Sequence, residues 1–134
     1  MSLATFQSRQ IAGNGIGTTH VVSTINLAIP SSLQLPFGVY ASQVTLKYGQ
    51  DAVTFDAALH YGPRPTATDL SPSLEVHILD IPEFASNYNQ REISVEVLQW
   101  IREIQKFGSF AQLKDQIGRD VQHIRTFMED YRKG

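Results

Sequence analysis

Cysteine is absent from the sequence, and this absence excludes disulfides, thiolate zinc sites, iron–sulfur clusters and a cysteine nucleophile. Long apolar runs are absent too, because no stretch approaches the ~18 consecutive apolar residues of a membrane span. Charge of one sign is also lacking, since 11 Lys and Arg stand against 13 Asp and Glu for a net charge of −2. Such a balance creates no basic field for nucleic acid. We therefore expect neither a membrane nor a nucleic acid as a partner.

The beginning of the chain lacks the basic opening and the continuous apolar core of a signal peptide. A cytoplasmic location is therefore expected. With 134 residues, 42% of them hydrophobic, the chain is long and apolar enough to fold as one domain, residues 1–134, around one core. Residues 1–19 are expected to lead into this domain, either as a flexible segment or as an edge strand.

Charge is spread unevenly along the chain, because only six charged residues lie in 1–70 and the rest lie in 71–134. The first half is rich in Thr, Val, Ala, Gly and Ser, which favour strands and turns. The second half is rich in Glu, Gln, Arg, Ile and Leu, which favour helices. Each half is too short to build a core alone. The sequence therefore predicts one α+β domain.

Four segments of the first half alternate between apolar and polar residues with a period of two: 20–29, 39–48, 52–61 and 74–80. One buried and one wetter face are typical of an antiparallel sheet, and the connections are too short for crossover helices. Gly49 favours a two-residue type II′ turn between the second and third segments. This turn predicts a hairpin that aligns Val44 with Phe55, Leu46 with Val53, and Gln43 with Asp56. A meander over residues 20–80 follows.

The second half changes to helical spacing. Asn89 and Glu92 form a candidate capping box ahead of apolar residues that recur every three or four positions from Ile93 to Ile104. Gly108 favours a helix end, and Ser109 with Gln112 forms a second capping box. The predicted fold is therefore a four-stranded, mainly antiparallel sheet followed by a C-terminal pair of helices, over residues 89–132, packed on one face.

The predicted core combines the apolar face of the sheet with the apolar stripes of both helices. Its members are Val21, Ile25, Leu27, Val44, Leu46, Val53, Phe55, Leu59, Val76, Ile78, Ile93, Val97, Ile101, Ile104, Leu113, Ile117, Val121 and Ile124.

No cofactor or metal motif is present. Gly13, Gly15 and Gly17 alternate ahead of a predicted strand, whereas a dinucleotide-binding loop has the spacing G-x-G-x-x-G after a strand and before a helix. The cluster also lacks the lysine of a Walker A loop. H-E-x-x-H pairs and acidic calcium loops are missing. We expect no cofactor and no metal ion.

The polar face of the predicted sheet is one candidate for catalysis. It carries His60, His77, Asp56 and Glu75, and such residues are common general acids and bases. Asp56 and His60 stand four residues apart on one strand, about 13 Å, so a site requires convergence from several strands. On this hypothesis the protein is a small cofactor-free hydrolase or isomerase. The competing interpretation is an ordinary solvated sheet face.

The absence of catalytic motifs favours a different function, a non-enzymatic protein-interaction module such as an adaptor, an assembly factor or a chaperone-like subunit. The expected partner is another protein or a second copy of the chain, bound at the helical hairpin or a sheet edge. Aromatic residues and methionine often dominate such interfaces. The candidate partner-binding residues are Trp100, Phe107, Phe110, Met128 and Tyr131. The same side chains can instead be used up in covering the sheet.

Overall fold

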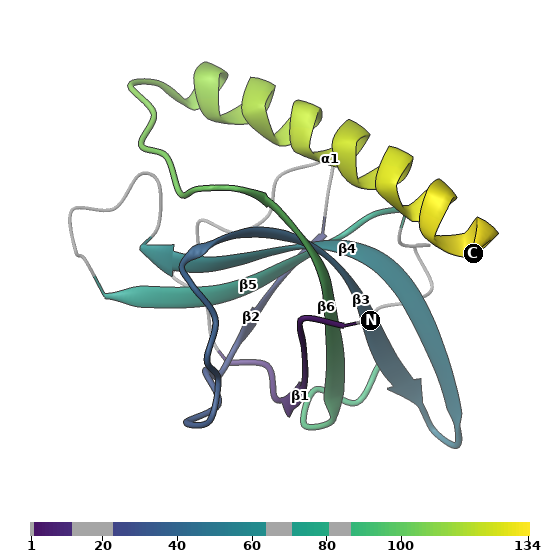
Figure 1. The fold of residues 1–134 in the computed structure, drawn as a ribbon. Helices are drawn as coiled ribbons and strands as arrows, with labels where there is room; N and C mark the ends of the chain where they lie inside the picture. The colour runs from purple at the N-terminus through teal and green to yellow at the C-terminus, as the bar shows by residue number, and fades with distance from the viewer. Residues whose placement is uncertain (1, 12–22, 64–70, 81–86) are drawn as a thin grey trace.

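A computed structural model describes residues 2–11, 23–63, 71–80 and 87–134. These residues form six strands and one helix. The elements are β1 (Ala4–Ser8), β2 (Ser23–Leu27), β3 (Gly38–Tyr48), β4 (Asp51–Pro63), β5 (Pro72–Ile78), β6 (Ile93–Arg102) and α1 (Phe110–Lys133). The strands form one antiparallel sheet in the order β1-β6-β3-β4-β5-β2. The sheet curls into a half-barrel, and α1 crosses its outer side (Figure 1).

The predicted hairpin between β3 and β4 is confirmed. Tyr48 pairs with Asp51, and the three predicted alignments, Val44 with Phe55, Leu46 with Val53 and Gln43 with Asp56, are all present. Gly49 has a φ of 65°, which a type II′ turn requires at its first central residue. Local turn chemistry and two-residue alternation were sufficient to set this register.

The position of β2 differs from the predicted meander. The strands β3, β4 and β5 do follow one another in the sheet, but β2 pairs with β5 rather than with β3. Residues 20–22 of the first predicted segment lie outside the described residues. Segment Ala4–Ser8, for which a flexible tail and an edge strand both remained open, forms β1 at the sheet edge beside β6.

The first helix of the predicted pair, based on the spacing from Ile93 to Ile104, is wrong, because Ile93–Arg102 is strand β6. Ile93, Val95 and Val97 are buried with a period of two, and their β-branched side chains favour a strand. The predicted capping box does not form. The Asn89 side chain accepts a hydrogen bond from the Arg91 amide. Glu92 instead forms an ion pair with Lys47 of the neighbouring strand.

Helix α1 begins at the second predicted capping box. The Ser109 side chain accepts a hydrogen bond from the Gln112 amide, and the Gln112 side chain accepts one from the Gly108 amide. Two otherwise unpaired amides at the helix start are thereby satisfied. The described residues thus contain a single helix rather than the predicted pair.

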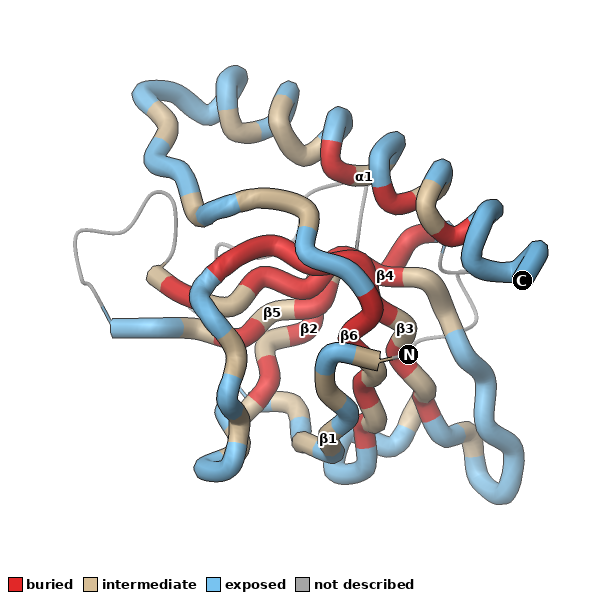
Figure 2. Tube along the Cα trace, in the orientation of Figure 1, coloured by how far each residue is buried: buried red, intermediate tan, exposed pale blue. Residues whose placement is uncertain are grey.

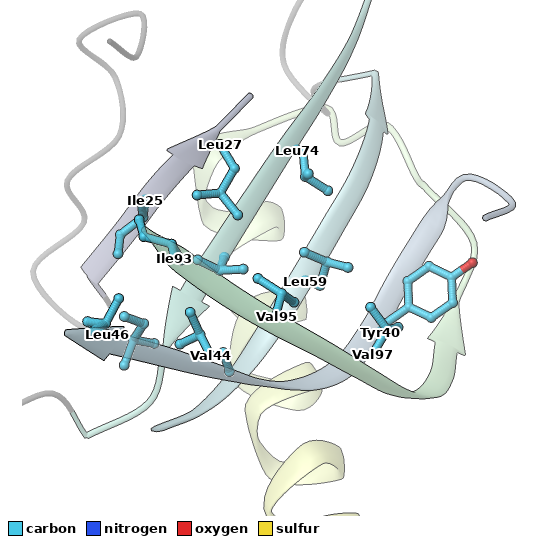
Figure 3. Close-up of a cluster of buried hydrophobic side chains, with 13 residues drawn as sticks. Ile25, Leu27, Tyr40, Val44, Leu46, Leu59, Leu74, Ile93, Val95 and Val97 are labelled. Carbon is cyan, nitrogen blue, oxygen red and sulfur yellow. The ribbon is translucent and has the colours of Figure 1, made fainter. Parts of the chain in front are cut away.

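The main core lies on the inner, concave face of the curled sheet (Figures 2 and 3). Its buried side chains come from five strands: Ile25, Leu27, Tyr40, Val44, Leu46, Ala57, Leu59, Leu74, Val76, Ile78, Ile93, Val95 and Val97. The curled sheet buries this face mainly against itself, with Leu33, Leu35 and Tyr88 packed beside it, and no helix of the described residues covers it. Most predicted sheet residues are among them, but Val53 is 42% exposed near the hairpin tip, and Val21 lies outside the described residues.

Helix α1 packs on the outer face, opposite to the face that it was predicted to cover. Ile124 and Met128 are fully buried against the small side chains of Ala41 and Ala58, with Leu79 and Leu98 beside them. Five other predicted core residues, from the end of β6 onward, are only partly buried: Ile101, Ile104, Leu113, Ile117 and Val121. Small residues in the middle of the sheet let the helix approach closely.

Arginine–aspartate pairs attach α1 to the sheet along its length. Arg102 of β6 binds Asp120 of α1 at 2.8 Å, and Arg132 binds Asp56 of β4 at 2.9 Å. Arg125 binds Asp80 just after β5, and its hydrogen bonds hold the pKa of Asp80 below the usual value. These contacts place the helix over one part of the outer face.

Candidate active site

The outer face of the sheet carries a transverse row of polar residues. Asn26 of β2 lies opposite Glu75 of β5, and Glu75 lies opposite His60 of β4. His60 in turn pairs with Val39 of β3, which pairs with Arg102 of β6. Neighbouring strands are about 4.8 Å apart, so side chains opposite one another on one face are close enough to act on one ligand. We call Asn26, Glu75 and His60 the polar row.

A second pair lies directly beside the polar row. The Thr24 hydroxyl and the Nδ1 atom of His77 are 2.9 Å apart, on paired positions of β2 and β5. On the other side, the Ser73 hydroxyl donates to Glu75 Oε1 at 3.3 Å. Side chains from three neighbouring strands therefore converge on Glu75.

The two histidines of this region are both held in the neutral form. Burial lowers the pKa of His60 to about 4. The charge of Glu75 opposes this effect, while a protonated His77 would add to it, as the charge of Arg102 does. Burial also lowers the pKa of His77, against the opposing charges of Glu75 and Asp120. Desolvation disfavours an imidazolium ion in both places.

Arg102 and Asp120 close the region on the helix side. The guanidinium donates from Nε and from its second terminal nitrogen to the Asp120 carboxylate, at 2.8–3.1 Å, and donates to the Glu103 carbonyl from the other terminal nitrogen. Gln116 donates a further hydrogen bond to Asp120. Because its hydrogen-bond donors are used within the protein, Arg102 links β6 to α1.

Of the four candidate catalytic residues, the structure brings together His60, His77 and Glu75, but not Asp56. Asp56 lies on the outer face four residues before His60, at about 13 Å along the strand. Its carboxylate is engaged by both terminal nitrogens of Arg132 and by Gln43. Asp56 therefore anchors the C-terminal end of α1.

The five candidate partner-binding residues do not form one surface. Met128 of α1 is fully buried against the sheet. Phe107 packs beside Arg102, with the guanidinium carbon 6.0 Å from the ring centre. Trp100 packs edge-on against Tyr40. Tyr131 stacks on Phe127, while Phe110 projects into solvent at the helix start.

Sequence reasoning missed Thr24, Arg102 and Asp120 as parts of this region. Arg102 stood in a segment predicted as helix, so its place beside the sheet was not visible. Thr24 was on the expected polar face, but the pairing of β2 with β5 is a long-range contact that no local pattern indicates. An acidic residue on the apolar side of α1, as Asp120 is, was the one available signal.

Comparison with known proteins identifies the family. The sequence profile of flavokinase, described as riboflavin kinase, matches residues 2–128. The chain belongs to the riboflavin kinase family. The bifunctional riboflavin kinase/FMN adenylyltransferase of Haemophilus influenzae is 37% identical over 119 residues, which are 89% of this chain and 37% of that protein. The corresponding protein of Escherichia coli K12 is 33% identical over 89% of this chain and 36% of its own length.

A solved structure described as a macrolide-efflux protein from Streptococcus pneumoniae has the same fold. Its TM-score is 0.71 at 27% identity, over 90% of this chain and 38% of that chain. The chain thus spans little more than a third of the length of the relatives that it matches. No helix in the described part of the chain is long and apolar enough to cross a bilayer.

Family membership corrects the functional predictions. A riboflavin kinase is an enzyme, so the prediction of a non-enzymatic interaction module is wrong. The alternative of a hydrolase or isomerase is not supported either, because kinases transfer a phosphoryl group. The physical reason for the first error is that the sequence was searched for local motifs, whereas the polar row combines side chains from separate strands.

Proposed function

We propose that the chain transfers the terminal phosphoryl group of a nucleoside triphosphate to a hydroxyl group of riboflavin, with the polar row as its catalytic centre. The profile match over residues 2–128 supports the reaction type and the flavin. The observation that carries the location is the alignment of Asn26, Glu75 and His60 on three neighbouring strands. The relatives' second named activity, FMN adenylyltransferase, is outside the proposal because the matching profile is that of the kinase.

Glu75 is the residue proposed to accept a proton. A kinase orients the attacking hydroxyl and takes its proton with a carboxylate. The hydroxyl oxygen forms a bond to the terminal phosphorus while the bond from this phosphorus to the bridging oxygen breaks. The nucleoside diphosphate leaves, and the hydroxyl proton passes to the Glu75 carboxylate. Asp56 and Asp120 are less suited because each is held by an arginine.

Thr24 and Asn26 are suited to the phosphoryl donor. Kinases use the magnesium salt of the nucleotide, and magnesium prefers oxygen ligands, few from the protein and the others from phosphate and water. The Thr24 hydroxyl and the Asn26 amide oxygen lie on β2 beside Glu75 and His77 and provide this kind of ligand. Their role is to hold the donor in line with the hydroxyl that Glu75 orients.

The test is the formation of flavin mononucleotide from riboflavin and magnesium ATP, followed by chromatography with fluorescence detection. The variant Glu75→Gln keeps the shape of the side chain and removes its basicity. We expect it to lower kcat by at least about 100-fold, the usual contribution of a general base. The matched control is Glu92→Gln, because Glu92 is exposed and pairs with Lys47 away from the polar row.

Two results would contradict the proposal. Wild-type protein that forms no flavin mononucleotide would exclude riboflavin kinase activity for this chain. Full activity in Glu75→Gln would leave the reaction in place and show that Glu75 is not the base. Circular dichroism of both variants checks that the fold is intact.

A further inference from the structure

His60 is an unusual residue because it is buried and its ring lacks a hydrogen-bond partner among the described residues. The residue is 8% exposed, and neither Nδ1 nor Nε2 has a partner in this described part of the chain. Leaving a buried polar group unsatisfied destabilises a protein, and such groups in native structures commonly serve a ligand or an ordered water. The fold gains nothing from an imidazole here that an apolar side chain would not provide.

The position of His60 in the sheet places it beside Glu75. Along β4 its neighbours on the same face are Ala58, which packs under Ile124 and Met128 of α1, and Gly62, where an added Cβ would meet Ile104 and Phe37. Across the sheet it lies opposite Glu75, the proposed proton acceptor. A group bound at His60 is therefore next to the site of the reaction.

The chemistry of a neutral imidazole selects the kind of ligand. One ring nitrogen donates a hydrogen bond and the other accepts one. An ionised phosphate group accepts hydrogen bonds but does not donate them. It would therefore satisfy only the ring nitrogen that donates. A hydroxyl group both donates and accepts, so a chain of hydroxyl groups matches both nitrogens.

We propose that His60 binds the hydroxyl-bearing side chain of riboflavin and so positions the reacting hydroxyl at Glu75. This inference rests on the proposed function and goes beyond it by naming the part of the substrate that is recognised and the residue that recognises it. His60 is a positioning residue, since the proton of the reacting hydroxyl goes to Glu75. Its two hydrogen bonds form only when the flavin is bound.

The decisive experiment compares two flavins and two variants. Riboflavin carries the hydroxyl chain, whereas lumiflavin has the same ring system and only a methyl group in its place. His60→Leu removes both hydrogen-bonding atoms, and His60→Gln restores a donor and an acceptor. Binding is measured by quenching of flavin fluorescence, and KM is measured for riboflavin and for magnesium ATP.

We expect His60→Leu to weaken riboflavin binding and to raise its KM by about 10-fold, as expected for one or two neutral hydrogen bonds. Lumiflavin binding and the KM for ATP should stay within about twofold of wild type, because neither involves the hydroxyl chain. His60→Gln should recover most of the riboflavin affinity. The melting temperature of His60→Leu should equal or exceed that of wild type, since an unsatisfied polar group has been removed.

Each other outcome overturns a defined part of the inference. An unchanged KM for riboflavin in His60→Leu shows that His60 does not contact the substrate. A raised KM for ATP alone places the nucleotide there instead. Equal losses for riboflavin and lumiflavin, with a lowered melting temperature, indicate a structural role. If wild-type protein forms no flavin mononucleotide, the proposed function itself fails, a result distinct from all of these.

Discussion

The inner face of the sheet forms the apolar core and the outer face carries the polar row, although their residues alternate along the same strands. On β4, Leu59 is fully buried inside while the adjacent His60 lies on the outer face; on β5, Val76 lies inside between Glu75 and His77 outside. The inner face is closed by the curl of the sheet, and its apolar side chains pack on one another (Figure 3). Leu33, Leu35 and Tyr88, which lie outside the strands, add to this packing.

The outer face is covered only in part. The buried positions of α1 lie on its side toward the sheet (Figure 2). There Ile124 and Met128 cover Ala41 and Ala58, and arginine–aspartate pairs hold the helix in place. The polar row lies on this face near the Arg102–Asp120 pair. The comparison shows that one face can be optimised for stability while the other keeps polar groups that stability alone would not select.

The largest expected effect is on the inner face. Leu59→Ala removes a fully buried side chain that the curled sheet cannot replace, and it should lower the free energy of unfolding by about 2–5 kcal/mol. Urea denaturation followed by circular dichroism measures this loss. His60→Leu, one residue away on the outer face, is the matched control and should lose nothing. Similar losses at both positions would break the distinction between the faces.

The next effect concerns the attachment of the helix. Arg102→Met leaves the buried Asp120 carboxylate without its charged partner and with only the Gln116 hydrogen bond, which should lower the free energy of unfolding by about 3 kcal/mol or more in urea denaturation. Arg119→Met is the control: Arg119 pairs with Asp115 in solvent, with both side chains about two-thirds exposed, and its loss should stay below about 1 kcal/mol. Equal effects in the two variants would mean that the Arg102–Asp120 pair does not hold α1.

A smaller effect is the pH dependence of stability that His60 of the outer face causes. The pKa of His60 is about 4 in the folded protein against 6.5 for an ordinary histidine, so between these values the unfolded chain binds more protons. Stability should therefore fall as the pH falls below 6.5. From this residue the loss is about 2 kcal/mol at pH 5 relative to pH 7.

The His77 pKa is lowered as well, so its contribution has the same sign. In His60→Leu the loss between pH 7 and pH 5 should shrink but not vanish. A His60→Leu variant with an unchanged pH profile would show that its imidazole is not desolvated.

The smallest effect tests two glycines that lie in open surroundings. Neither Gly49 nor Gly118 has an atom within 4 Å of an added Cβ, so the backbone alone decides the outcome of Gly→Ala. Gly118→Ala in α1 should raise stability by up to about 1 kcal/mol, through helix propensity. Gly49→Ala should lower it by about 1 kcal/mol or slightly more, because φ is 65° at the turn. Thermal unfolding of both variants resolves the two signs.

Several structural features were predictable because they depend on neighbours in sequence. The Gly49 turn, the β3–β4 register and the start of α1 at Ser109 follow from turn and capping chemistry. The inner-face residues of β3, β4 and β5 followed from strict alternation. Segment 93–102 was not predictable in this way, since its apolar residues fit a helical as well as a strand period until its neighbours β1 and β3 are known.

The candidate site likewise combines residues that local sequence patterns place with residues that only long-range contacts place. The alternation of β4 and β5 by itself determined that His60, Glu75 and His77 share the outer face, because side chains on a strand alternate strictly between two sides. Only the tertiary structure decided that Thr24 and Asn26 join them and that Asp56 does not. The pairing of β2 with β5 and the Arg132–Asp56 contact are long-range, and they are decided by how the whole sheet curls and where α1 packs.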